Sequence, residues 1–363
     1  MKNTKFEAVL GCLFIFLFIL SVMVIGLDVL SRPYISSRSS FERQALSSDV
    51  RHSYPYVMFS GNPSAASLNA SGYKGPVPAM PKSQAEYRVI FLGGSTLING
   101  DPTIPQLIDH LFEQDGLGHV RVYNFGVVSS VTSMELVKIF MEAVDYAPDL
   151  IVMYGGGNDI IQSFFSDPRP GYPFNFFVYE NNPLLESDIR RYPAGFMLLF
   201  GSNLLRSYYP DMFREKFFPM DAVRREIGYG TPEWHEEIAN TYIKNIFKAD
   251  KISEAFGAEF ISFFQPLVFY KEQLTQKEEV DTVFQFKEGA MYIGRGIHHK
   301  INHLRENDRR KFVDLRYLFA GETGPVFSDF IHIRQEAKPV VAREIYKSLR
   351  PLIKEGPDEK IWF

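Results

Sequence analysis

From residue 87 onward the chain alternates between short apolar runs and longer segments in which apolar residues recur at helical spacing. The run Val89-Ile90-Phe91-Leu92 holds only apolar residues, which predicts a strand buried on both faces of its sheet. Segments such as 133–144 instead place their apolar residues on one side of a helix. Because strands that alternate with helices pair in parallel, this pattern predicts one parallel sheet with helices on both faces.

The expected elements follow this alternation to the end of the chain. Residues 160–232 interrupt it and are expected to form an insert within a single domain, 87–363. Strands are expected at residues 87–92, 120–125, 149–154, 259–264 and 311–315. Helices are expected at residues 105–114, 133–144, 233–256, 280–305 and 335–349.

The insert at 160–232 is rich in phenylalanine and tyrosine, and it carries several prolines and arginines. It follows Asn158 closely, so one reading is a lid or wall beside a site at that position. A second reading is contact with the membrane interface or with a membrane partner, where aromatic and basic residues are enriched. A small subdomain with its own apolar core is the third reading, and all three stay open.

An uncharged apolar run near the start of the chain predicts a membrane anchor. Residues 8–27 are 20 consecutive residues without a charge, long enough as a helix to span about 30 Å of hydrocarbon. A cleaved signal peptide is the alternative, but such peptides have shorter apolar cores and a small-x-small cleavage site, which residues 25–30 lack. Lys2 and Lys5 precede the run, so residues 1–7 are expected to be a cytoplasmic tail.

Residues 31–86 are expected to be a stalk between this anchor and the domain. They are rich in Ser, Pro, Gly and Asn, a composition typical of extended linkers. Arg32, Arg38 and Arg43 follow the apolar run and reduce the charge asymmetry across it. On balance the body is expected outside the cytoplasm, in the periplasm or at the cell surface, with the lipid bilayer as a partner through residues 8–27.

Several other classes of function find no support in the sequence. The chain has 39 basic and 43 acidic residues and a net charge of -4, with no basic run, so no nucleic-acid partner is expected. The run Gly155-Gly156-Gly157 lacks the Lys-Ser/Thr of a phosphate-binding loop. In a two-histidine zinc motif a glutamate follows the first histidine, whereas Lys300 follows His299. We therefore expect no cofactor and no metal.

Polar side chains gather where the expected strands end. Ser95, Gly126 and Asn158 follow the first three strands, while Asp329 and His332 share the last loop before the closing helix. Because the carboxyl ends of parallel strands meet at one edge of a sheet, we expect these residues to lie close together.

These residue types suit acyl transfer. A serine attacks a carbonyl when a histidine removes its proton and a carboxylate orients that histidine. The backbone N–H groups of Ser95 and Gly126 and the side-chain amide of Asn158 would be the donors to the developing oxyanion. Taken singly, each residue also has a simpler reading: Ser95 and Asp329 as turn or helix-cap residues, and Asn158 as a turn residue.

Four short motifs around these residues, in this order, resemble the four blocks of the SGNH (GDSL-type) hydrolase superfamily. They are Gly93-Gly94-Ser95, Asn124-Phe125-Gly126, Gly156-Gly157-Asn158-Asp159 and Asp329-x-x-His332. The resemblance covers roughly residues 87–349, and it departs from the family at Gly94, where relatives usually carry Asp.

The resemblance implies a three-layer α/β/α fold with a flavodoxin-like parallel sheet, and acyl-ester chemistry. It implies that Ser95 is the nucleophile, His332 the base and Asp329 its orienting acid. It also implies that Gly126 and Asn158 contribute to the oxyanion hole.

The expected function is that of a membrane-anchored serine esterase or acyltransferase. Anchored proteins similar to this chain often act on acyl groups, commonly acetyl, of cell-surface glycans, so an acylated glycan or another ester is the expected substrate. One alternative is a lipid esterase or thioesterase that uses its anchor to stay near the substrate. Another is a non-catalytic subunit of a polysaccharide assembly or export complex, with the insert as a docking surface for a membrane protein.

Overall fold

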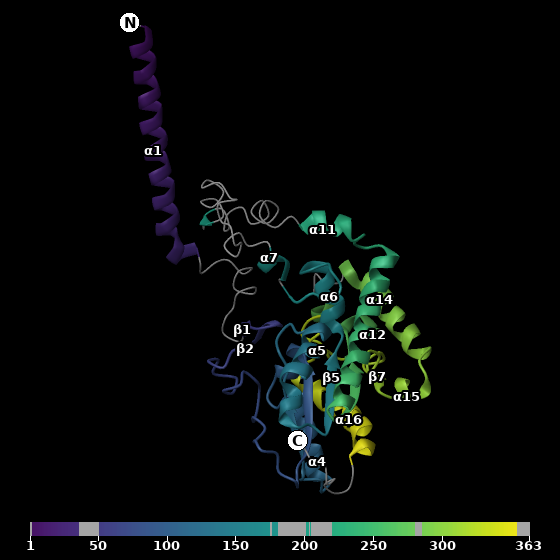
Figure 1. Ribbon diagram of the computed structural model, residues 1–363. Coiled ribbons are helices and arrows are strands. Elements are labelled where there is room, and N and C mark those ends of the chain that lie inside the picture. Colours follow the sequence, from purple (N-terminus) through teal and green to yellow (C-terminus); the bar gives the residue numbers. More distant parts are fainter. Residues whose placement is uncertain are drawn as a thin grey trace. The chain divides into compact units, whose positions relative to one another are not determined.

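The computed structural model describes residues 2–35, 51–174, 176–180, 201–202, 204, 220–279 and 285–353. The chain divides into two compact units (Figure 1). The first comprises Met1–Ser47 and Phe177–Val223, and the second comprises Ser48–Phe176 and Arg224–Phe363. Most of the insert between residues 180 and 220 lies outside the described residues, so the three readings of its role stay open.

The second unit is built around a five-stranded parallel sheet (Figure 1). The spatial order of its strands is β4-β3-β5-β6-β7, which is 2-1-3-4-5 when the five are numbered along the chain. This is the flavodoxin-like order, so the expected fold class is confirmed. The strands are β3 (Tyr87–Gly93), β4 (Val120–Asn124), β5 (Leu150–Gly155), β6 (Glu259–Phe264) and β7 (Phe312–Asp314).

The central strands are continuous apolar runs because both of their faces are covered. Val89 of β3 lies opposite Val122 of β4 and Leu150 of β5, which sets the register across the middle of the sheet. Residues 89–92 are wholly buried, as are the first three residues of β5.

Helices cover the two faces of this sheet in two groups. On one face α4 packs against α16, and on the other α12 packs against both α5 and α14. The grouping follows from right-handed crossovers, because the chain moves one way from β3 to β4 and the other way from β4 to β5. The helices are α4 (Ile104–Gln114), α5 (Thr132–Met141), α12 (Pro232–Ala255), α14 (Lys287–Asn302) and α16 (Lys338–Leu349).

Local chemistry defines where two of these helices begin. Thr103 accepts a hydrogen bond from the N–H of Gln106, and the Gln106 side chain accepts one from the N–H of Thr103, which forms a capping box before α4. At α12 the cap is Thr231, which accepts from the N–H of Trp234, and a proline occupies the first turn.

Several element ends differ from the expected ones. The helix expected at 133–144 ends at Met141, because Glu142 leaves the helical conformation and a 3-10 turn, Ala143–Tyr146, follows. The carboxylate of Glu142 binds the Tyr73 hydroxyl at 2.6 Å, a contact that the local sequence does not reveal. The last helix begins as a 3-10 turn at Gln335–Ala337 and becomes α16 only at Lys338. Residues 280–284 of the helix expected at 280–305 lie outside the described residues, and α14 ends at Asn302.

Residues 51–86, which were expected to form most of the stalk, belong to the second compact unit. They begin with an antiparallel pair, β1 (Arg51–Tyr54) and β2 (Met58–Gly61). Tyr73 is buried, and its ring stacks on Phe125 with the ring centroids 4.3 Å apart. This segment therefore packs on the domain at least from β1 onward.

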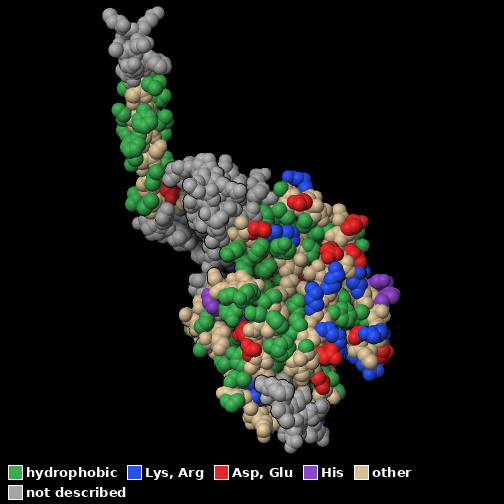
Figure 2. Space-filling model, in the orientation of Figure 1, with side chains coloured by type: hydrophobic (Ala, Val, Ile, Leu, Met, Phe, Trp, Pro, Cys, Tyr) green, Lys and Arg blue, Asp and Glu red, His purple; other side chains and the backbone are tan. Residues whose placement is uncertain are grey.

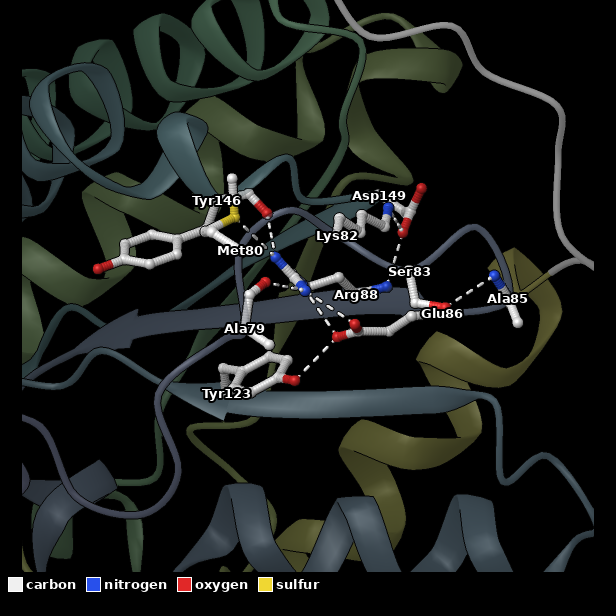
Figure 3. Close-up of polar contacts among 10 residues, drawn as sticks. All are labelled: Ala79, Met80, Lys82, Ser83, Ala85, Glu86, Arg88, Tyr123, Tyr146 and Asp149. Carbon is white, nitrogen blue, oxygen red and sulfur yellow. Dashed lines mark hydrogen bonds and ion pairs between the residues drawn. The ribbon is translucent and has the colours of Figure 1, made fainter.

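A buried arginine ties the end of this segment to the amino end of the sheet (Figure 3). The Arg88 side chain is fully buried and donates to the carbonyls of Ala79 and Tyr146 at 3.0 and 2.6 Å. Its Nε donates to Glu86 at 2.9 Å. Nearby, Asp149 accepts from the Arg88 backbone N–H at 2.6 Å and from the side chain of Lys82. The two remaining guanidinium N–H groups face the second Glu86 oxygen at 2.8 Å and the Met80 sulfur at 3.5 Å, so this buried guanidinium has a partner for each donor.

In the first unit, α1 (Lys2–Ile35) is a single helix whose side chains in the membrane-length stretch are mostly apolar and exposed (Figure 2). Residues Val9–Ser31 have a mean hydropathy of 2.9 over a length that suffices to cross a bilayer. Near the end of this stretch the Asp28 carboxylate accepts from the Ser202 hydroxyl and from the Leu204 N–H, both at 2.9 Å.

Candidate active site

Ser95 lies just beyond the carboxyl end of β3, at the first position of the short helix α3 (Ser95–Ile98). Gly93 must lack a side chain here, since an added Cβ would lie 2.2 Å from the Tyr154 carbonyl oxygen. The Ser95 side chain is largely buried, and its Oγ lies 2.6 Å from Nε2 of His332. The strand thus delivers a hydroxyl to the edge of the sheet, within hydrogen-bond distance of a base.

Asp329 and His332 lie in the loop between β7 and α16, at the tip of a narrow hairpin. The Asp329 Oδ2 lies 2.6 Å from Nδ1 of His332, while its Oδ1 accepts the N–H groups of Ile331 and His332 at 2.9 and 2.7 Å. Because a carboxylate can only accept, Nδ1 carries the ring proton, and Nε2 is left to accept from the Ser95 hydroxyl. The three side chains therefore form one continuous hydrogen-bonded chain.

The electrostatics of Asp329 agree with this arrangement. Burial alone would raise the pKa of its carboxyl. The hydrogen bonds from the His332 ring and backbone and from the N–H of Ile331 help to outweigh burial and hold the pKa below its ordinary value. Asp329 is thus ionised at neutral pH and able to orient the imidazole.

Asn158 lies in the first turn of α6 (Gly157–Phe165), directly after β5. The turn before it needs glycine at position 156, where φ is +89° and an added Cβ would lie 2.2 Å from the Phe264 ring. The Asn158 amide donates one hydrogen to the carbonyl of Ser130 at 2.8 Å, and its second hydrogen has no acceptor among the described residues. Its Nδ2 lies only 2.5 Å from the place where Gly94 would carry a Cβ, which brings the amide beside the serine turn.

Gly126 lies beside the same turn, but its N–H is already in use. It donates to the Asn124 side-chain oxygen at 3.0 Å. A side chain at Gly126 would also clash, since its Cβ would lie 2.8 Å from Cβ of Leu97 and 3.3 Å from the Gly94 carbonyl oxygen. The structure thus brings Ser95, Asp329 and His332 together and sets Asn158 and Gly126 beside them. The Gly126 N–H must share its hydrogen if it is to bind an oxyanion.

Two buried carboxyl groups, Asp159 next to Asn158 and Glu135 on α5, had no catalytic role in the sequence reasoning. Asp159 accepts from the N–H of Thr132 at 3.1 Å and from its hydroxyl at 2.5 Å, and Asn245 donates to that hydroxyl at 3.1 Å. Burial raises the pKa of Asp159 to about 6, against the opposing effect of the Thr132 bonds. Burial, with the nearby Asp159 charge, also raises the pKa of Glu135 well above its usual range.

Gln265, at the carboxyl end of β6, also reaches this edge of the sheet. Its Oε1 accepts from the Thr96 hydroxyl at 3.3 Å, and its Nε2 has no partner among the described residues. It lies next to Gly157, because a Cβ there would be 3.0 Å from Nε2. Its place after a strand was the only sequence signal for it.

Three further histidines lie close together in the sequence: His298 and His299 in the last turns of α14, and His303 directly after it. His298 is 3.3 Å from the Asp314 carboxylate, and the His303 ring bonds the His299 carbonyl at 2.7 Å. Within the described part of the chain, no group of three or more His, Cys, Asp or Glu side chains could hold a metal ion.

Comparisons with known proteins identify no family for this chain. No family model matches it, and no curated protein matches it. Similar solved structures include an acetyl xylan esterase, AlAXEase, at a TM-score of 0.40 and 10% identity, covering 72% of this chain and 99% of that one. TesA matches at a TM-score of 0.40 and 14% identity, covering 73% and 99%. A GDSL-like lipase from Bacteroides thetaiotaomicron matches at 0.38 and 12%, covering 76% and 93%. Because these TM-scores lie below 0.5, the function proposed below rests on the geometry of the site.

Proposed function

We propose that this chain is a serine esterase or acyltransferase that is anchored in a membrane by α1. The observation that carries the proposal is the chain of two 2.6 Å contacts, from Ser95 Oγ to His332 Nε2 and from His332 Nδ1 to Asp329. A serine, a histidine and a carboxylate in this geometry activate the hydroxyl as a nucleophile.

The reaction would run in two halves through an acyl-enzyme. Ser95 Oγ attacks the acyl carbonyl while His332 takes its proton, and the tetrahedral oxyanion forms against the Ser95 N–H and the free hydrogen of Asn158. His332 then gives the proton to the departing alcohol, leaving the acyl group on Ser95. Water or a sugar hydroxyl, deprotonated by His332, attacks this ester and regenerates the serine.

For the substrate we propose an O-acyl group, most simply acetyl, on a cell-surface glycan. Support comes from the apolar helix Val9–Ser31, whose length and composition suit an anchor, and from the resemblance to anchored SGNH-type proteins. The catalytic unit would then work outside the cytoplasm. A lipid ester is the rival substrate, and acyl-chain length separates the two.

The test uses the full chain purified in detergent and assayed with p-nitrophenyl esters. The parent should hydrolyse the acetate, and Ser95→Ala should lower kcat by at least about 10³-fold. Ser64→Ala, on an exposed loop, is the matched control and should keep the parent rate. Equal turnover by the parent and by Ser95→Ala would refute the catalytic role. A clear preference for palmitate over acetate would favour the lipid substrate.

The acyl group itself can be read from the protein. Brief exposure to a candidate donor, followed by acid quenching and mass spectrometry, should show an added acetyl mass on the peptide that contains Ser95. The same peptide from His332→Ala should remain unmodified, because the hydroxyl then lacks its base.

A further inference from the structure

The hairpin that carries Asp329 and His332 is braced at its base. Phe327 and Ile333 form an antiparallel bridge, and the N–H of Arg334 donates to the carbonyl of Val326 at 2.7 Å. At the tip, the Ser328 N–H donates to the His332 carbonyl at 2.9 Å. Through these bonds, the position of residues 326 and 327 decides where Asp329 and His332 point.

The carboxylate of Glu278, on the short helix α13 (Gln276–Glu279), binds the backbone of residues 326 and 327, where the hairpin begins. Its Oε1 accepts the N–H groups of Val326 and Phe327, each at 3.0 Å. Its Oε2 accepts from the Lys271 ammonium at 2.7 Å and from the N–H and hydroxyl of Thr275, both at 2.8 Å. Glu278 is 3% exposed, so no water competes for these bonds.

Lys271 also contacts the chain just before the hairpin. Its ammonium donates to the Gly324 carbonyl at 2.6 Å as well as to Glu278. Lys271 follows the 3-10 turn Val268–Tyr270, and the Val268 N–H donates to the Phe330 carbonyl at 3.2 Å. The segment after β6 thus contacts the hairpin both at its base and near its tip.

The charge state of Glu278 is constant over any practical assay range. Burial alone would raise the pKa of its carboxyl, but the bonds from Lys271, Thr275 and Phe327 together lower the pKa to about 2. Glu278 is therefore ionised across the pH range of an esterase assay.

We propose that Glu278 is a positioning residue, which aims Asp329 and His332 at Ser95 by fixing the backbone of Val326 and Phe327. This inference rests on the proposed esterase or acyltransferase function. Glu278 touches none of the three reacting side chains, and no local sequence pattern links it to them. Displacement of a catalytic group by about 1 Å costs on the order of 10²-fold in rate, so a shift of this hairpin lowers kcat.

The first test is Glu278→Gln in the full chain in detergent, with Glu272→Gln, an exposed neighbour, as the matched control. The amide keeps the size of the side chain, but it turns a donor toward Lys271 and disturbs the shared bonds. We expect kcat for p-nitrophenyl acetate to fall by about 10- to 100-fold, KM to stay within about twofold and the control to match the parent. An unchanged kcat, or a rise in KM alone, would overturn the proposal.

Removing the Lys271 ammonium should restore part of the kcat that Glu278→Gln loses. In Lys271→Met/Glu278→Gln the amide oxygen accepts from Val326 and Phe327 with no ammonium opposite, so kcat should recover by about tenfold. Lys271→Met/Glu278→Met lacks the acceptor and should stay slow. If Glu278→Gln does not fold, these two double variants replace it, and equal kcat values in both would overturn the proposal.

Two further measurements keep this inference separate from the proposed function. A parent that does not depend on Ser95 refutes the esterase function, whatever Glu278 does. A crystal structure of Glu278→Gln tests positioning without activity: the distance from Ser95 Oγ to His332 Nε2 should lengthen beyond hydrogen-bond range, whereas an unchanged 2.6 Å would overturn the positioning role.

Discussion

Replacing Gly94 by alanine is expected to lower kcat by about 100-fold. The backbone at Gly94 is extended, with φ −87° and ψ −159°, so any residue could adopt it, and only space requires glycine. An added Cβ would lie 2.5 Å from Nδ2 of Asn158, and the amide would have to move by at least about 0.5 Å to reach the 3.0 Å limit of real contacts.

The size of the effect follows from what Asn158 is proposed to do. Loss of one oxyanion donor costs about 10²–10³ in kcat, and displacement should cost near the lower end, about 2.7 kcal/mol of transition-state stabilisation. KM for p-nitrophenyl acetate should change little, because the oxyanion exists only in the transition state.

A double-mutant cycle checks the cause. Asn158→Ala alone should be slow, and adding Gly94→Ala to it should cost almost nothing more, because the displaced amide is gone. Gly118→Ala is the matched control, since no atom lies within 4 Å of its added Cβ. Full activity in Gly94→Ala, or additive losses in the double variant, would refute the reasoning.

Two further predictions concern stability, measured by denaturation of the full chain in detergent. Because the pKa of Asp159 is raised from 3.8 to about 6, the folded state keeps a proton that the unfolded chain releases, so stability falls as pH rises from about 4 to 6. Asp159 contributes about 3 kcal/mol of this fall, so stability should fall less steeply in Asp159→Asn than in the parent; equal slopes would contradict this. Arg88→Met leaves two carbonyls and Glu86 without their hydrogen-bond donor, so it should lower the free energy of unfolding by about 2–4 kcal/mol. Arg309→Met removes a surface ion pair and should lower it by under about 1 kcal/mol. Equal losses would contradict the burial argument.

The sheet could be predicted because its signal is local. Residues 89–92 and 150–152 are apolar without interruption, and both segments are wholly buried in central strands. The local sequence did not indicate the end of α5. It falls at Glu142, whose carboxylate binds Tyr73, a residue 69 positions away in sequence. Likewise, the sequence around Arg88 does not indicate that this charged side chain donates hydrogen bonds to the carbonyls of Ala79 and Tyr146.

For the site, too, some features could be predicted from the sequence and others could not. The order of the motifs was sufficient to predict that Ser95, Asp329 and His332 meet, because parallel strands end at one edge of the sheet. It was not sufficient for the details that depend on side-chain geometry. The hydrogen bond from the Gly126 N–H to the Asn124 side chain is one such detail. The close approach of the Asn158 amide to Gly94 is another, and the sequence indicates neither.

The distance in sequence between Ser95 and His332 has a consequence for the growing chain. The two residues are 237 positions apart, and ribosomes add about 5–20 residues per second, so the serine precedes its base by roughly 10 to 50 s. During that interval the nascent protein carries a hydroxyl with no partner to activate it. The enzyme should therefore stay silent until synthesis is nearly complete, and any fragment that ends before His332 should be inert toward esters.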